Sequence, residues 1–311
     1  MAKIHVDTDL GGDIDDLCAL AMLLGWPDVD LTGITVVGDT KGKRTGYVRY
    51  VLALDGRSDI PVAAGADTSL GCYRLDLTLP AEERYWPEPV PASPNPPEAA
   101  IELLKRSIEQ GATIVGIGPF TNLYLLDMQN PGILLEANLV LMGGYVHPPR
   151  AGFPKWGNQD DFNVQVDVMS ARHVFANSTP TLVTLAVTAE TALRTSDVER
   201  LRGSGALGRL LARQAEAFAE DEKMAARFGA TCAEVPADII NFHHDPLACA
   251  IAVGWRNGVE IAELPLIIEE REGWLVERID DSGRPFKVVA KVDGQRFNDF
   301  WIDVTTKVSR A

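Results

Sequence analysis

Short apolar runs alternate along the chain with longer stretches in which apolar residues recur at helical spacing. The apolar runs are continuous rather than alternating, which is typical of parallel strands buried on both faces. They lie at 4–6, 31–37, 113–117, 139–142 and 181–187. The helical patterns between them cover 17–24, 44–54, 99–109 and 168–175. Strands and helices in this alternation predict βαβ units, and therefore an α/β fold with an open, mostly parallel central sheet flanked by helices.

Two regions depart from that alternation. Seven prolines between 80 and 97 argue against a helix or central strand there. This segment is expected to be a surface loop or lid, with a domain linker as the alternative, because apolar α/β pattern resumes on both sides. The stretch 264–311 has more strand-like alternation and is expected to extend the sheet. With no internal repeat and no Gly/Ser linker, the sequence predicts one domain over 1–311.

Composition narrows the class of protein. The chain has 46% hydrophobic and 23% charged residues, as folded domains do. Its 44 acidic residues outnumber its 29 basic ones, giving a net charge of −15, which repels phosphate backbones and argues against nucleic acid as a partner. No apolar run reaches the ~20 residues of a membrane helix, and no signal-peptide layout precedes the first strand. Four scattered cysteines without a CxxC pair fit reduced thiols, so we expect a cytoplasmic protein.

The most informative segment is an acidic loop between the first apolar run and the first helical pattern. It holds Asp7, Asp9, Asp13, Asp15 and Asp16, with two glycines among them. In open α/β sheets, ligands bind at the carboxyl ends of strands. Carboxylates brought together there raise one another's pKa unless a cation lies among them, and oxygen ligands favour Ca²⁺ or Mg²⁺. Helix capping explains one or two of these residues, but not five, so the segment predicts a metal or catalytic site.

Other acidic motifs fit this loop less well. An EF-hand needs an oxygen ligand at Gly11 and Glu at Cys18. The pair Asp7 and Asp9 is shared with haloacid-dehalogenase phosphatases, but that family usually has Thr at the position of Gly11. Instead, the segment resembles the start of the inosine-uridine-preferring nucleoside hydrolase family, Asp-x-Asp-x-Gly followed by Asp-Asp-x-x-Ala. In this chain the loop before the Asp-Asp pair is two residues longer, as in a subset of the family.

Three further segments match that family in the expected order. Gly118-Pro119-Phe120-Thr121-Asn122 is similar to its Gly-Pro-Leu-Thr-Asn segment. The stretch from Met142-Gly143-Gly144 to Asp161-Phe162-Asn163 is similar to its strand end and its Glu-Phe-Asn motif. Asn241-Phe242-His243-His244-Asp245 is similar to its His-Asp segment. Together the four segments span residues 7–245, so the resemblance implies a Rossmann-like nucleoside hydrolase fold.

The resemblance implies a mechanism and assigns residues to it. Calcium would be bound by Asp9, Asp16, the Thr121 carbonyl and Asp245. Asp9 would take a proton from the attacking water, and His244, with an imidazole pKa near neutral, would protonate the leaving base. The implied contacts to a nucleoside substrate come from Asp15, Asp39, Met142, Asn158, Asp161 and Asn163. Stacking on the base is expected from Trp156 or Tyr145, and specificity from the loops at 73–86 and 218–228. Family resemblance also implies a homo-oligomer, a dimer or tetramer.

Some residues depart from the family pattern or carry no role. Asp39 stands where the family commonly has Asn, and Asp161 stands where it has the longer Glu. Asp13 lies in the enlarged loop and is assigned no role. Asp167 is expected to cap the helix that follows it. Residues 203–208 spell GxGxxG, but they follow a polar helical pattern rather than a strand, so we expect a plain loop between helices.

Calcium-dependent hydrolysis of the N-glycosidic bond of ribonucleosides is the function that these patterns favour. Two alternatives stay open. One is a homologue that binds ribonucleosides without turnover. The other is a haloacid-dehalogenase-type phosphatase with Asp7 as nucleophile, which would leave Asp245 without a role.

Overall fold

The computed structural model describes residues 1–70, 78–96 and 98–307 of the chain. A nine-stranded sheet lies at the centre of the fold. The parallel strands run in the order β3 (Val62–Ala64), β2 (Val29–Val36), β1 (Ala2–Thr8), β4 (Thr113–Gly116), β5 (Asn138–Met142) and β6 (Thr181–Val183). The order reverses between β1 and β4, which creates the switch point where open α/β sheets bind their ligands. The predicted open, mostly parallel sheet flanked by helices is confirmed.

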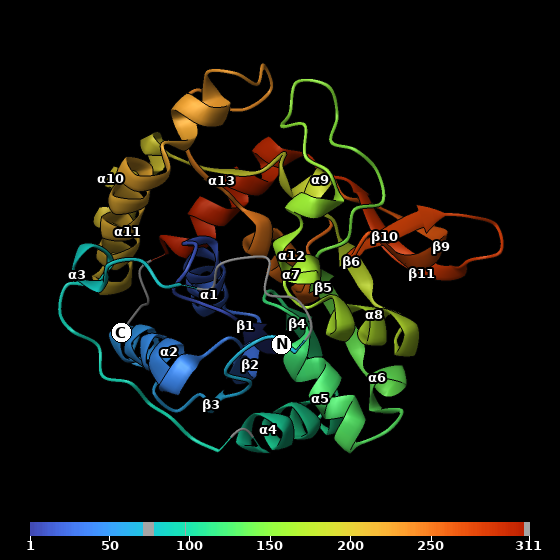
Figure 1. The fold of residues 1–311 in the computed structure, drawn as a ribbon. Coiled ribbons are helices and arrows are strands. Elements are labelled where there is room, and N and C mark those ends of the chain that lie inside the picture. Colours follow the sequence, from blue (N-terminus) through green and yellow to red (C-terminus); the bar gives the residue numbers. More distant parts are fainter. Residues whose placement is uncertain (71–77, 97, 308–311) are drawn as a thin grey trace.

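Helices cover both faces of the sheet (Figure 1). One hydrophobic core lies under α1 (Asp15–Gly25), α2 (Lys43–Leu54), α11 (Ala206–Glu222), α12 (His244–Val253) and α13 (Gly294–Thr305). A second lies under α4 (Glu98–Glu109), α5 (Thr121–Gln129), α6 (Ile133–Glu136) and α8 (Val168–Asn177). Strands sandwiched in this way are buried on both sides, which explains their continuously apolar sequences.

The carboxyl-terminal region extends the sheet. Strand β11 (Arg284–Lys291) pairs in parallel with β6, and β9 (Glu260–Arg271) and β10 (Trp274–Ile279) follow it antiparallel. The expected β extension over 264–311 is therefore confirmed for its strands. Helix α13 was not predicted. Asp293 caps it by accepting a hydrogen bond from Arg296 N at 3.1 Å, and its buried face, with Phe297 and Trp301, packs on the first core.

Shorter elements connect this frame to the site. They are a two-stranded sheet of β7 (Ala192–Arg194) and β8 (Ile239–Phe242), the helices α3 (Glu82–Tyr85), α7 (Phe162–Gln165), α9 (Leu185–Thr188) and α10 (Val198–Arg202), the 3₁₀ turns Thr40–Gly42, Asn158–Asp160 and Thr195–Asp197, and a π-helical turn, Ala225–Gly229. Within the described residues, no helix has the length and apolar character to cross a bilayer.

Two local predictions were wrong. The run 181–187 was expected to be one strand, but β6 ends at Val183 and the chain turns into α9. An apolar run of this length does not distinguish a strand from a buried helical turn. The segment 80–97 was expected to lack helix, yet α3 occupies the proline-free stretch between Pro80 and Pro87.

Two smaller predictions hold. Asp167 caps α8 by accepting a hydrogen bond from Ser170 N at 3.2 Å. Residues 203–208 begin in the loop between α10 and α11 and run into the first turn of α11, so the Gly-rich sequence follows a helix and not a strand.

Candidate active site

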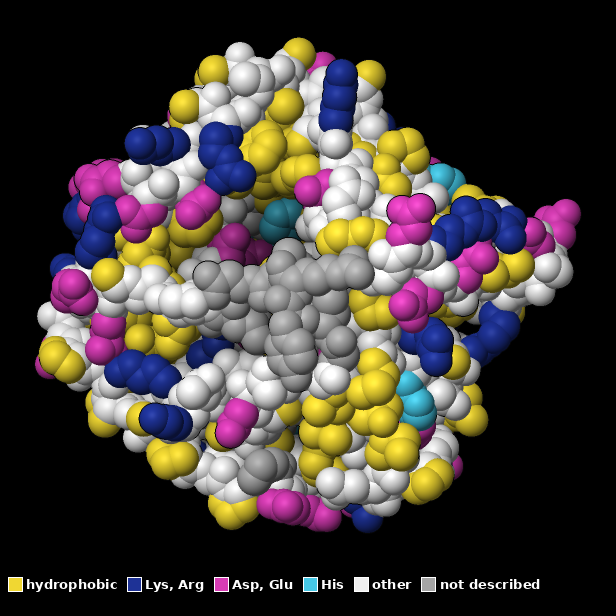
Figure 2. All heavy atoms as spheres, in the orientation of Figure 1, with side chains coloured by type: hydrophobic (Ala, Val, Ile, Leu, Met, Phe, Trp, Pro, Cys, Tyr) yellow, Lys and Arg dark blue, Asp and Glu magenta, His cyan; other side chains and the backbone are white. Residues whose placement is uncertain are grey.

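A cavity of about 570 Å³ opens at the carboxyl ends of the central strands. Figure 2 looks into this hollow, with acidic and histidine side chains on its floor and hydrophobic side chains above them. Its walls come from the acidic loop after β1, residues 78–85, the end of α11 with the π-helical turn, and the junction of β8 with α12. Both loops expected to set specificity contribute to it, except that residues 73–77 lie outside the described residues. A cavity of this size accommodates a small polar metabolite.

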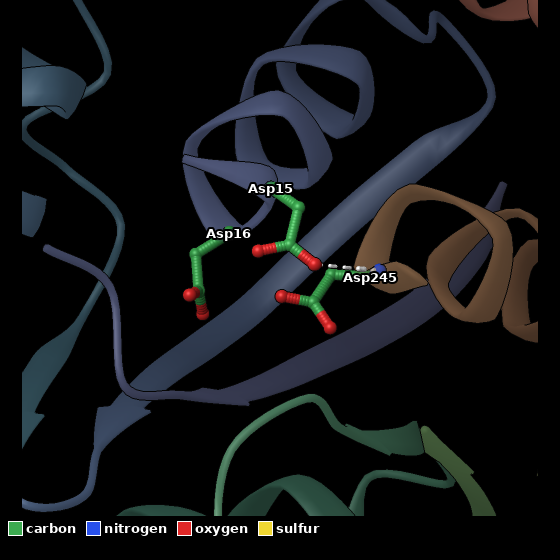
Figure 3. A group of neighbouring side chains, drawn as sticks. All are labelled: Asp15, Asp16 and Asp245. Carbon is green, nitrogen blue, oxygen red and sulfur yellow. Dashed lines mark hydrogen bonds between the residues drawn. The ribbon is translucent and has the colours of Figure 1, made fainter. Parts of the chain in front are cut away.

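Three carboxylates converge on the floor of the cavity (Figure 3). Asp15 and Asp16 open α1, and Asp245 is the second residue of α12. One oxygen from each lies within 4.8 Å of the others. The backbone N–H of Asp245 also donates to Asp15 Oδ2 at 3.4 Å. Two helices from opposite ends of the sequence thus point their amino termini, which favour negative charge, at one place.

The electrostatics of this cluster are unfavourable for the side chains alone. Burial raises the pKa of Asp15, Asp16 and Asp245 well above its usual value, and repulsion from the neighbouring carboxylates raises it further. Asp9 lies beside them and adds to this repulsion, and burial also raises its own pKa. Such a group is stable when ionised only if positive charge lies among the oxygens.

Local backbone features make this convergence possible. Gly11 has φ +116°, and a side chain there would place Cβ 2.8 Å from the Tyr47 ring. Gly118, after β4, leaves room for Asp9, whose Oδ1 would lie 2.9 Å from an added Cβ. Thr8 at the end of β1 donates its hydroxyl hydrogen to Asp16 and accepts from Leu10 N at 3.1 Å. Glycine is thus required at position 11 by the left-handed backbone and by close approach, and at position 118 by close approach to Asp9.

Arg44 is a site residue that the sequence did not reveal. Its guanidinium donates from Nε to the Gly38 carbonyl at 3.0 Å and from Nη1 to the Asp9 carbonyl. It lines the cavity, and its charge opposes the rise in the pKa of Asp9 and Asp16. Because Gly38 follows β2 and Asp9 follows β1, Arg44 joins two loops at the carboxyl edge. No motif marks it, since only the fold brings it there.

Aromatic side chains form the opposite part of the cavity. The Trp156 ring packs edge-on against Phe242 and Phe228, with centroids 5.0 and 5.7 Å away, and lies 5.8 Å from the His244 ring. His244 Nδ1 lies 2.6 Å from the Thr188 hydroxyl. Burial lowers the pKa of His244 to about 4, whereas the sequence led us to expect a value near neutral. At neutral pH this imidazole is therefore uncharged.

Some of the predicted substrate-binding residues line this cavity and others do not. Asp15, Met142 and Asn163 line it, as do Asp9 and His244. Asn163 Nδ2 donates to the carbonyls of Ile117 at 3.1 Å and Met142 at 3.2 Å, which fixes its amide at the switch point.

The remaining predicted residues have their polar groups engaged elsewhere. Asp39 binds the first turn of α2, accepting from Arg44 N at 2.7 Å and Thr45 N at 3.0 Å. The Asn158 amide donates to the Leu275 carbonyl at 3.4 Å. The Thr121 hydroxyl donates to Asp167 at 2.6 Å, a contact that does not involve the backbone carbonyl expected to bind calcium. Of these three residues, none is among the described residues that line the cavity.

Asp161 lies close to a second buried carboxylate, that of Glu277. Asp161 accepts from Gly144 N at 2.5 Å, and Glu277 on β10 accepts from the next backbone N–H, that of Tyr145, at 3.0 Å. Burial raises the pKa of Asp161 to about 7, and burial with repulsion from Asp161 raises that of Glu277 to about 8. The two carboxylates hold the loop after Met142, behind the cavity wall. No sequence pattern connects Glu277, 116 positions away from Asp161, with this loop.

Fold and site together define an α/β protein with buried carboxylates gathered at the switch point of its sheet, where such folds bind ligands. The sequence matches the inosine-uridine preferring nucleoside hydrolase family over residues 4–299, and the chain belongs to that family. The family predicted from the four sequence segments is therefore confirmed.

The sequence identity to individual relatives is low. The chain is 33% identical over 216 residues to the pyrimidine-specific ribonucleoside hydrolase RihA of Salmonella arizonae, an alignment that covers 65% of this chain and spans 66% of the relative's length. Its fold is similar to that of a plant nucleoside hydrolase, with a TM-score of 0.80, 21% identity, and 98% and 99% of the two chains covered. It is also similar to a purine-preferring ribonucleoside hydrolase from Gardnerella vaginalis, with a TM-score of 0.74, 22% identity and 98% of each chain covered.

Proposed function

We propose that this protein hydrolyses the N-glycosidic bond of ribonucleosides in a calcium-dependent reaction, giving ribose and the free base. The observation that carries the proposal is the convergence of Asp15, Asp16 and Asp245 on the floor of a cavity with an aromatic wall. Carboxylates can bind a hard cation and sugar hydroxyls, and aromatic rings suit a planar base. Because a relative is a pyrimidine-specific ribonucleoside hydrolase, we would test the pyrimidine ribonucleosides uridine and cytidine first.

The donor set fits calcium. All the converging groups are carboxylate oxygens, which suit Ca²⁺ better than a soft metal. Asp9, Asp16 and Asp245 would hold the ion together with the Thr121 carbonyl, as the family resemblance implies. When bound, the ion supplies positive charge that lowers the pKa of a coordinated water and orients the ribose hydroxyls.

The side chains of this protein then activate the water, bind the ribose and assist the departing base. Asp9 accepts the proton of the attacking water. Asp15 and Asn163 bind ribose hydroxyls from two sides of the cavity floor. The uncharged His244 donates a hydrogen bond to the departing base through Nε2–H when Thr188 donates to Nδ1. Trp156 stacks on the base and Phe228 and Phe242 pack behind it, excluding water from the leaving group.

The phosphatase alternative lacks a nucleophile in the right place. Asp7 is 1% exposed, and its Oδ1 accepts from Thr35 Oγ1 at 2.6 Å and Asn122 Nδ2 at 2.8 Å. It is not among the described residues that line the cavity. A ribonucleoside-binding homologue without turnover is distinguished only by assay. One domain over 1–311, a cytoplasmic location and a homo-oligomeric state stay predictions.

An Asp9→Ala variant tests the proposed mechanism. The variant is expected to lose ribose release from uridine by 10³-fold or more, because it removes the proton acceptor and a calcium ligand together. Asp28→Ala is the matched control, since Asp28 is an exposed carboxylate at the opposite, amino end of the sheet. Full activity in Asp9→Ala would contradict the assignment of the base.

A further inference from the structure

Asp13 stands in the part of the acidic loop that is longer than in most of the family, and it has a defined set of partners. Its Oδ1 accepts hydrogen bonds from Ile14 N at 2.5 Å and Asp15 N at 3.4 Å. The same oxygen accepts from the side-chain amide of Asn241, 228 positions along the chain. Asp13 therefore bonds to the start of α1 and to the strand β8 at once.

Asn241 is placed to transmit this contact to the other half of the acidic cluster. It is 2% exposed and is the third residue of β8, four residues before Asp245. Strand β8 runs directly into α12, so the position of Asn241 sets where the first turn of α12 begins. Asp13 reaches the same turn from the other side, because Asp15, whose N–H it accepts, in turn accepts from Asp245 N at 3.4 Å.

Among the described residues, the two halves of the cluster are joined directly by the 3.4 Å hydrogen bond from Asp245 N to Asp15 Oδ2, and the bond between Asp13 and Asn241 adds a second link. Asp15 and Asp16 belong to α1 and Asp245 to α12, and their carboxylates repel one another. Repulsion favours separation of the two helix ends, whereas a metal site needs its oxygens at fixed spacing. A hydrogen-bonded link between the two halves counters the repulsion before any cation binds.

We propose that Asp13 and Asn241 form a clamp that holds the α1 and α12 halves of the metal site at binding distance. The inference rests on the proposed function, since it assigns the clamp to the calcium site. Asp13 is a positioning residue in this account: it acts through Asp15 and Asp245 and does not itself bind the ion. The longer loop thus brings the Asp13 carboxylate within hydrogen-bonding distance of Asn241 on β8.

Calcium affinity, measured by isothermal titration on the full chain, tests the clamp. Asp13→Ala leaves the buried Asn241 amide without its acceptor and is expected to weaken calcium binding about ten-fold. Asp13→Asn keeps the Oδ1 acceptor but removes the charge, and is expected to stay within about three-fold of wild type. Asp28→Ala controls for loss of a distant carboxylate. Equal losses in Asp13→Asn and Asp13→Ala would show a charge effect and overturn the clamp.

A reciprocal exchange gives an independent test. Asn241→Asp opposes two carboxylates and is expected to weaken calcium binding by ten-fold or more. Adding Asp13→Asn to it restores one donor and one acceptor with their positions exchanged, and should recover binding to within about three-fold of wild type. A double variant no better than Asn241→Asp, or an Asp13→Ala that binds as wild type does, would overturn the clamp. A folded wild-type protein that binds no calcium would instead refute the proposed function, and the clamp with it.

Discussion

The Asp245→Asn substitution should change thermal stability in opposite directions with and without calcium. In the metal-free protein, Asp245 faces Asp15 and Asp16 with oxygens within 4.8 Å. Two full charges at that distance repel by about 3.5 kcal/mol at an effective dielectric constant of about 20. The raised pKa of all three carboxyls means that protonation already relieves part of this repulsion at neutral pH. The remaining relief from Asn is about 1–2 kcal/mol.

A smaller effect opposes that gain. Asp245 lies in the first turn of α12, where a negative charge stabilises the helix by about 0.3–1 kcal/mol. The metal-free variant is therefore expected to be more stable than wild type by about 1 kcal/mol, which raises Tm by about 2 °C for a chain of this size. With calcium at about 100 times its Kd, the wild type gains about 2.7 kcal/mol. The variant gains much less, because it has lost a ligand.

Differential scanning calorimetry in chelator and in calcium measures both effects. The expected result is a crossover, with Asp245→Asn melting above wild type in chelator and below it in calcium. Asp28→Asn is the control, and it should shift neither curve. An Asp245→Asn protein that melts below wild type in chelator would show that mutual repulsion is not the dominant cost of this cluster, contrary to this prediction.

Three further predictions concern Trp156 in the cavity wall and two buried carboxylates outside the cavity lining. Folding raises the pKa of Glu277 from its usual 4.5 to about 8, so the folded protein binds this proton more tightly than the unfolded chain does. The protonated carboxyl therefore adds to the free energy of unfolding below pH 4.5, and this contribution is lost as the pH rises from about 4.5 through 8. Glu277→Gln should thus flatten the fall in Tm between pH 5 and 9, and an unchanged slope would contradict this. Trp156→Ala should raise KM for uridine about ten-fold with a smaller change in kcat, as loss of base stacking requires. Steady-state kinetics in which only kcat fell would contradict it. Asp39→Ala should lower stability by about 1–2 kcal/mol in denaturant titrations, since Asp39 accepts from two backbone N–H groups in the first turn of α2, while KM stays within about two-fold. A large rise in KM would instead support the substrate contact expected from the sequence.

The sequence predicted the fold class because buried parallel strands have a recognisable pattern. Continuous apolar runs mark β1, β2, β4 and β5, and helical spacing marks the helices between them. The same pattern of apolar residues gave wrong predictions where a helix and a strand have the same apolar sequence. At 185–188, a buried helical turn has the apolar sequence of a strand, and α13 was concealed by the strand-like alternation around it.

The site was predictable only in part. Asp15, Asp16 and Asp245 were connected across 230 positions by family resemblance and not by spacing, and the structure does bring them together. Arg44 belongs to no motif, and Asn241 opens the His-Asp segment but has no role assigned to it from the sequence. Their contacts to the acidic loop exist because α2 and β8 pack beside it, which is a property of the tertiary fold.

Free-ribose release from a panel of purine and pyrimidine nucleosides, measured with calcium and with chelator, decides whether this protein is a calcium-dependent hydrolase. We expect release from at least one ribonucleoside, with uridine and cytidine tested first, and its loss when chelator removes the ion. Release that persists in chelator would contradict the role given to calcium. No release from any nucleoside, with calcium bound and the protein folded, would contradict hydrolysis. That result would favour a protein that binds ribonucleosides without turnover.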